Sequence, residues 1–62
     1  MARYKVERME HGEETWSQIY DTAMLVTARR ALRIHRDGVV GYGRPKRVRI
    51  IDTVVNKVIA ED

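Results

Sequence analysis

The sequence predicts an α+β domain in which one amphipathic helix packs on an antiparallel sheet, with the elements in the order β-β-α-β-β. Three observations support this two-layer fold class: a pair of strand-like segments within residues 3–20, helical spacing of apolar side chains over residues 23–35, and a second strand-like pair within residues 47–61. Short connections within each pair favour antiparallel hairpins. The sheet face is the one large apolar surface against which the helix could be buried.

The first pair of strands is predicted over residues 3–9 and 15–20. Tyr4 and Val6 fall on one face of the first strand, because successive side chains of a strand point to opposite faces. Gly12 supplies the positive φ that a hairpin turn often needs. The second strand is rich in β-branched and aromatic residues, but both of its faces carry an apolar group, so its inward face stays open.

The helix is predicted over residues 23–35, with an N-cap at Asp21 or Thr22, whose side chains can accept hydrogen bonds from the first backbone amides. Gly38 follows and suits the left-handed conformation that ends many helices. The apolar stripe has the spacing i, i+3, i+7 and i+10 and comprises Leu25, Ala28, Leu32 and His35.

The second pair of strands is predicted over residues 47–53 and 57–61. Val48 and Ile50 alternate with arginines and are expected to point inward. Asn56 tolerates the left-handed conformation of a tight turn. The order of the four strands in the sheet stays open.

Residues 1–62 are too few for more than a single domain. Cysteine is absent, which excludes a disulfide framework and a thiolate metal site and fits a reducing cytoplasm. No stretch approaches the roughly 20 apolar residues of a membrane span, and the N-terminus lacks the apolar block of a signal peptide. We therefore expect a cytoplasmic protein with no membrane association and no cofactor.

No residue pattern indicates catalysis. His11 and His35 lack a third ligand at metal-binding spacing, and Ser17 has no base and acid beside it. The glycine-rich segment 38–43 follows a helix instead of opening one, unlike a phosphate-binding loop. We expect a non-enzymatic binding protein in which His35 packs or caps near the helix C-terminus, where a cation is favoured.

Charge is segregated along the chain. The formal net charge is +3, yet residues 29–49 contain eight basic groups and one acidic group, Asp37. The flanking segments 1–28 and 50–62 each carry a net charge of −2. Such segregation creates a local positive potential that the overall charge hides.

A binding surface is predicted to run from the outer side of the helix through the glycine-rich loop to the next strand. Guanidinium groups bind phosphates and carboxylates in bidentate fashion, and a tyrosine can stack on a base. Acidic residues elsewhere, among them Asp52, Glu61 and Asp62, could instead neutralise part of this set within the chain. The predicted site residues are Arg29, Arg30, Arg33, Arg36, Tyr42, Arg44, Lys46, Arg47 and Arg49.

The partner has more than one interpretation. Nucleic acid, either DNA or RNA, is the first, because phosphate contacts suit these arginines. The alternative is an inhibitor or adaptor that docks on an acidic protein surface, with Trp16, Tyr20 or Tyr42 as aromatic anchors. In a third, an exposed strand edge pairs with a second copy to form a homodimer.

The arrangement of elements resembles the small early proteins of bacteriophages and prophages, which are very short, cysteine-free ββαββ proteins. The resemblance spans most of the chain and is carried by residues 4–6, 16–20, 47–52 and 57–59, with a helix that contains Ala23, Ala28 and Ala31. It implies a protein that binds a host enzyme or nucleic acid in the host cytoplasm and redirects it. No functional residue is carried over from that resemblance.

Overall fold

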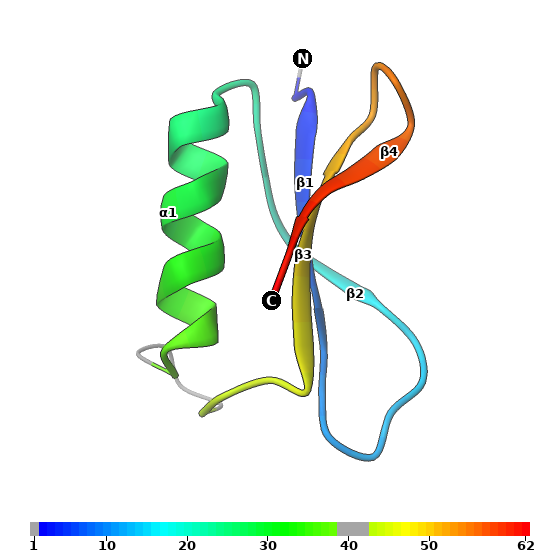
Figure 1. Cartoon of the computed structure of the whole chain (residues 1–62), viewed down its shortest axis with the longest axis vertical. Coiled ribbons are helices and arrows are strands. Elements are labelled where there is room, and N and C mark those ends of the chain that lie inside the picture. Colours follow the sequence, from blue (N-terminus) through cyan, green and yellow to red (C-terminus); the bar gives the residue numbers. More distant parts are fainter. Residues whose placement is uncertain (1, 39–42) are drawn as a thin grey trace.

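The computed structural model describes residues 2–38 and 43–62 and confirms the predicted α+β class and element order. Helix α1 (Leu25–Arg36) lies on one face of a four-stranded antiparallel sheet (Figure 1). The strands are β1 (Tyr4–Met9), β2 (Ser17–Thr22), β3 (Arg47–Asp52) and β4 (Lys57–Glu61). Within the described residues, no helix has the length and apolar character needed to cross a membrane.

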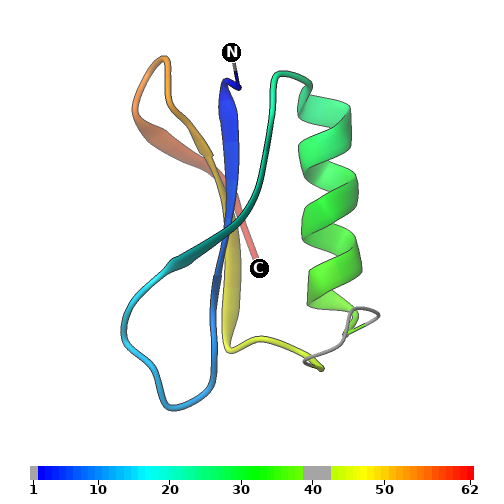
Figure 2. The ribbon, with the colours of Figure 1, turned by 180° about the vertical axis from the view of Figure 1, so that it is seen from behind.

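The strand order is β2-β1-β3-β4, so β1 and β3 are central and β2 and β4 form the two edges. The two hairpins are joined through the antiparallel pairing of β1 with β3, in which Val6 lies opposite Ile50 and Glu7 opposite Arg49. Figure 2 shows the molecule from behind, with β2 on the near side of the sheet and the chain continuing upward beside α1. Among the residues that the structure describes, no helix covers the second face of the sheet (Figure 1).

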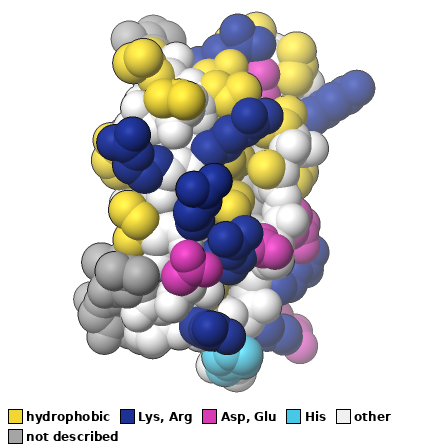
Figure 3. Space-filling model, turned by 60° about the vertical axis from the view of Figure 1, so that its left-hand side comes forward, with side chains coloured by type: hydrophobic (Ala, Val, Ile, Leu, Met, Phe, Trp, Pro, Cys, Tyr) yellow, Lys and Arg dark blue, Asp and Glu magenta, His cyan; other side chains and the backbone are white. Residues whose placement is uncertain are grey.

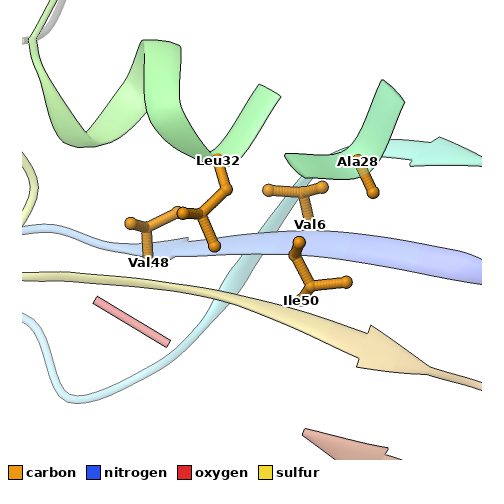
Figure 4. Close-up of a cluster of buried hydrophobic side chains, with 5 residues drawn as sticks. All are labelled: Val6, Ala28, Leu32, Val48 and Ile50. Carbon is orange, nitrogen blue, oxygen red and sulfur yellow. The ribbon is translucent and has the colours of Figure 1, made fainter. Parts of the chain in front are cut away.

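The core lies between α1 and the two central strands (Figure 4). Val48 and Ile50 are almost fully buried, which confirms the inward face predicted for this strand, and Val6 of β1 is buried beside them. From the helix, Ala28 and Leu32 pack against them, as the helical spacing predicts.

A bulge in β2 explains why its inward face is ambiguous from sequence. Val6 pairs with Tyr20 and Glu7 with Gln18, so Ile19 is an extra residue without a partner of its own. A bulge sets two residues of one strand against one residue of the other and interrupts strict alternation. As a result, Ile19 and Tyr20 both line the space beside α1.

The predicted start of the helix is wrong by two residues. Asp21 and Thr22 belong to β2, and the helix begins at Leu25 with Met24 as its N-cap, which makes no side-chain capping hydrogen bond. Thr22 lies opposite Tyr4 in the sheet. Pairing with β1 therefore extends the strand through residues that, taken alone, are good helix caps.

The predicted turn residues are confirmed by their backbone angles. Gly12 has a φ of +87° and Asn56 a φ of +56°. Gly38 has a φ of +72°, and its N–H donates to the carbonyl of His35 at 3.1 Å, which ends the helix. A Cβ at Gly38 would lie 3.2 Å from the backbone nitrogen of Arg44, so the close return of the chain also favours glycine.

Candidate polyanion-binding surface

Three arginines of α1 form an exposed cluster on the outer face of the helix. Arg29, Arg30 and Arg33 surround a shallow hollow together with Val26. None of the three forms an ion pair with a carboxylate anywhere in residues 2–38 and 43–62. We call these three residues the helix arginine cluster.

Helical geometry sets the direction of this cluster. Ala28 and Leu32 are buried against the sheet. Arg29 and Arg33 each follow one of these buried residues by one position, so they lie one turn apart on an exposed side of the helix, with about 5–6 Å between their Cβ atoms. Like charges at this spacing destabilise a helix by roughly 0.2–0.5 kcal/mol. Figure 3 shows basic side chains gathered on this side of the molecule, with acidic side chains beside some of them.

Arg36 differs from the helix arginine cluster because it meets two carboxylates. Its Nε lies 3.2 Å from Asp37 and 2.9 Å from Asp62. Asp62 is positioned by backbone hydrogen bonds with Val48 of 2.9 and 3.2 Å, which continue the pairing beyond β4. The positive charge at the C-terminal end of α1 is therefore partly neutralised within the chain.

The strand arginines lie on the open face of the sheet, away from the helix. Arg47 forms an ion pair with Glu61, and the guanidinium of Arg49 lies 2.8 Å from Glu7. Both guanidinium groups also stack on Trp16, with distances to the ring centroid of 5.0 Å for Arg47 and 3.9 Å for Arg49. These contacts combine charge pairing with cation–π attraction, so both arginines are already engaged.

The remaining predicted site residues belong to the connection between α1 and β3. Arg44 and Lys46 are exposed and have no ion-pair partner within the described parts of the chain. The side chain of Arg44 lies against Gly38, at the C-terminal end of the helix. Tyr42 lies outside the described residues, so its expected role in stacking stays a prediction.

The structure does not form the single arginine strip that the sequence predicts. Arg47 and Arg49 alternate with buried residues of β3, and this alternation turns them to the side of the sheet opposite α1. The prediction that acidic residues neutralise part of the arginine set is confirmed for two of them: Glu61 pairs with Arg47, and Asp62 pairs with Arg36. Asp52 instead accepts two hydrogen bonds from Arg3, which lies outside the predicted site. These hydrogen bonds lower the pKa of the Asp52 carboxyl group.

A buried arginine that the sequence interpretation did not include connects three parts of the fold. Arg8 is 2% exposed, and its Nε donates to both carboxylate oxygens of Glu10, at 2.8 and 2.9 Å. Its Nη1 approaches Nδ1 of His35 at 3.1 Å, and its Nη2 donates to the carbonyl of Gly43 at 2.7 Å. Strand alternation offered a signal, because Arg8 shares a face with Val6.

His35 is half-buried near the end of α1, as its predicted packing role requires. Its surroundings, however, do not favour the protonated, cationic form of the imidazole. A guanidinium group can only donate, so Nδ1 of His35 must accept and the ring is neutral. Burial, followed by the charge of Arg8, lowers the pKa of His35 below its usual value, while Glu10 opposes this shift. The proximity of Arg8 therefore reverses the expected preference of the helix C-terminus.

Acidification should reduce stability through His35. Because the pKa of His35 in the folded protein is below 6.5, the unfolded chain takes up this proton at a higher pH. The contribution should be complete above pH 6.5 and should be lost as the pH falls through that value and on through the folded pKa. Denaturant titrations between about pH 5 and 8 measure this slope.

His35→Gln should remove this part of the pH profile. His11→Gln is the matched control, because His11 lies in the exposed turn between β1 and β2. An unchanged profile in His35→Gln would assign the pH dependence to another group.

Comparisons with known proteins add no family to these observations. No protein-family model, no curated protein and no solved structure matches the chain. Among the residues that the structure describes, no cluster of three or more histidine, aspartate or glutamate side chains could hold a metal ion.

Proposed function

We propose that this chain is a non-enzymatic binding protein that engages a polyanion, nucleic acid first, through the helix arginine cluster. The supporting observation is that Arg29, Arg30 and Arg33 are exposed on one face of a single helix and have no carboxylate partner in the described residues. Arg44 and Lys46 extend the same potential beyond the end of the helix. Arg36 contributes less, because two carboxylates already neutralise it.

The arrangement favours phosphate groups as the ligand. Guanidinium groups form paired hydrogen bonds with phosphate oxygens. Such contacts neutralise backbone charge and release counterions, so the affinity should fall steeply with salt and depend little on base sequence. With three phosphates contacted on duplex DNA, the logarithm of the binding constant should change with the logarithm of salt concentration with a slope of roughly −3.

The double substitution Arg29→Gln with Arg33→Gln should weaken this binding and reduce the magnitude of the salt slope by roughly 2, because each lost phosphate contact accounts for about 1. Fluorescence anisotropy with labelled duplex and single-stranded DNA and RNA, at several salt concentrations, measures both quantities. Circular dichroism establishes that the helix is retained.

The double substitution Arg47→Gln with Arg49→Gln is the matched control. It removes the same charge, but from side chains that already contact carboxylates and Trp16. An equal loss of affinity in both double variants would show that net charge alone matters. No binding of the unaltered protein to any of the nucleic acids at low salt would reject the proposal.

An acidic protein surface is the second candidate. Val26 is 65% exposed and lines the same hollow as the helix arginine cluster, and an apolar group there gains more from a protein partner than from phosphates. Capture from a host lysate with and without nuclease distinguishes the two candidates. A partner that survives nuclease treatment and is lost from the Arg29→Gln, Arg33→Gln variant would favour the protein surface.

The setting of this activity is also part of the proposal. A chain without cysteine suits a reducing cytoplasm, which would be that of the host if the resemblance to early phage proteins reflects the chain's origin.

A further inference from the structure

A groove between α1 and the edge strand β2 has features that the helix arginine cluster does not. Its volume is about 290 Å³. Strand β2 contributes its two bulge residues, and the helix contributes one wall. The lining residues are Ile19, Tyr20, Thr27, Arg30, Ala31, Ile34 and His35.

The apolar lining of the groove remains accessible to solvent. Tyr20 is 43% exposed and Ile34 is 38% exposed, although both are large apolar side chains. The bulge at Ile19 turns two neighbouring side chains of β2 toward the helix, whereas the small side chain of Ala31 leaves space on the helical wall. Large apolar groups around a concave site are typical of a binding surface.

The backbone of β2 offers a second type of contact. Within the described residues this strand pairs with β1 alone, so one of its edges has no strand partner. An unpaired edge presents N–H and C=O groups that can bind another extended segment. The groove and this edge are adjacent, because Ile19 and Tyr20 belong to both.

The charge at the rim restricts the occupant. Arg30 lines the groove and has no carboxylate partner in the described residues, and it also borders the hollow of the helix arginine cluster. We propose that the groove binds an extended segment of another protein, which adds to the edge of β2, inserts apolar side chains beside Ile34 and places a carboxylate at Arg30. This site is separate from the proposed polyanion surface, with which it shares only Arg30.

An extended peptide satisfies all three features together. Its backbone pairs with β2, while alternate side chains point toward the groove because the strand period is two residues. A nucleic acid could meet the charge of Arg30, but it offers neither strand pairing nor aliphatic side chains for the groove. The geometry therefore favours a peptide with alternating apolar and acidic residues.

A displayed library of random peptides, selected against the immobilised protein, tests this proposal. Selection should enrich peptides in which apolar and acidic residues alternate. One enriched peptide is then synthesised with a fluorescent label, its affinity is measured by anisotropy, and its site is mapped by amide chemical shifts of the protein. The shifts should concentrate in β2 and along the groove side of α1.

Paired variants define the site. Ile34→Gln should weaken the peptide at least about tenfold, whereas Val58→Gln, an exposed apolar position of the opposite edge strand, should change affinity by less than about twofold. Arg30→Gln should weaken the peptide more than Arg29→Gln, which lies outside the groove. Neither Ile34→Gln nor Val58→Gln changes charge, so both should leave nucleic-acid binding intact, and the two proposals can fail independently.

Several outcomes would overturn the proposal. Selection could enrich no peptide, or the enriched peptide could bind Ile34→Gln as well as the unaltered protein. Shifts at β4 would place the peptide on the other edge. A concentration-dependent dimer with shifts in β2 would assign the edge to a second copy of this chain. If an oligonucleotide displaced the peptide and itself shifted the amide signals of both Arg30 and Ile34, the groove would be assigned to nucleic acid.

Discussion

Arg8→Met should destabilise the folded protein by about 2–4 kcal/mol, because it removes hydrogen bonds from a charged and buried donor. Methionine can occupy much of the same space, but it cannot donate to the carbonyl of Gly43 or to Nδ1 of His35. Both acceptors would lose a partner, and the carboxylate of Glu10 would lose its ion pair. The change is large for a chain of this size, whose total stability is expected to be roughly 3–9 kcal/mol.

Urea denaturation followed by circular dichroism measures this loss. Amide hydrogen exchange adds a local measurement at Lys46, whose N–H donates to the carbonyl of Met9 at 2.9 Å and should exchange faster when Gly43 is released. Lys5→Met is the matched control, since Lys5 lies exposed on the same strand. A loss in Arg8→Met no larger than in Lys5→Met, within about 0.5 kcal/mol, would show that Arg8 does not hold these segments together.

Ile50→Ala should cost about 2–5 kcal/mol, the usual range for truncation of a fully buried isoleucine. Ile50 has no exposed surface and lies in β3 opposite Val6, beneath the helix (Figure 4). Few atoms around it can move to fill the space, because β3 itself is held by pairing with β1 on one side and with β4 on the other. This variant should therefore be close to the limit of stability at room temperature.

Unfolding of Ile50→Ala can be followed by the fluorescence of Trp16, the single tryptophan of the chain. Ile59→Ala is the matched control, because Ile59 is 43% exposed in the edge strand β4 and should lose less than about 1 kcal/mol. Equal losses in the two variants would place the main core elsewhere than between α1 and the central strands.

Strand alternation was sufficient to predict that the strand arginines and the helix arginines lie on different sides of the sheet. It correctly turned Val48 and Ile50 inward and Arg47 and Arg49 outward. Since the helix must cover the inward face, outward strand arginines must lie on the far side from the helix arginine cluster. The prediction of one continuous strip treated residues that follow one another in the chain as neighbours in space.

The environment of Arg8 could not be predicted from local sequence patterns. Alternation placed it on the face of Val6, but a charged side chain on a buried face is tolerated only with suitable partners. Those partners come from separate parts of the chain: Glu10 beyond the strand, His35 in the helix and Gly43 in the following loop. Their convergence depends on the docking of α1 against the sheet, which no local pattern specifies.

By itself, the sequence determined the element order, the inward face of β3, and the left-handed turn residues, because these follow from side-chain periodicity and local backbone preference. The strand order, the bulge at Ile19 and the distribution of free and paired arginines were decided by tertiary structure. The ion pair of Arg49 with Glu7, for example, joins residues 42 positions apart. Such an ion pair forms only when β1 and β3 become neighbours in the sheet. Because Glu7 is paired with Arg49, it is not a counter-charge for the helix arginine cluster, which has no carboxylate partner in the described residues.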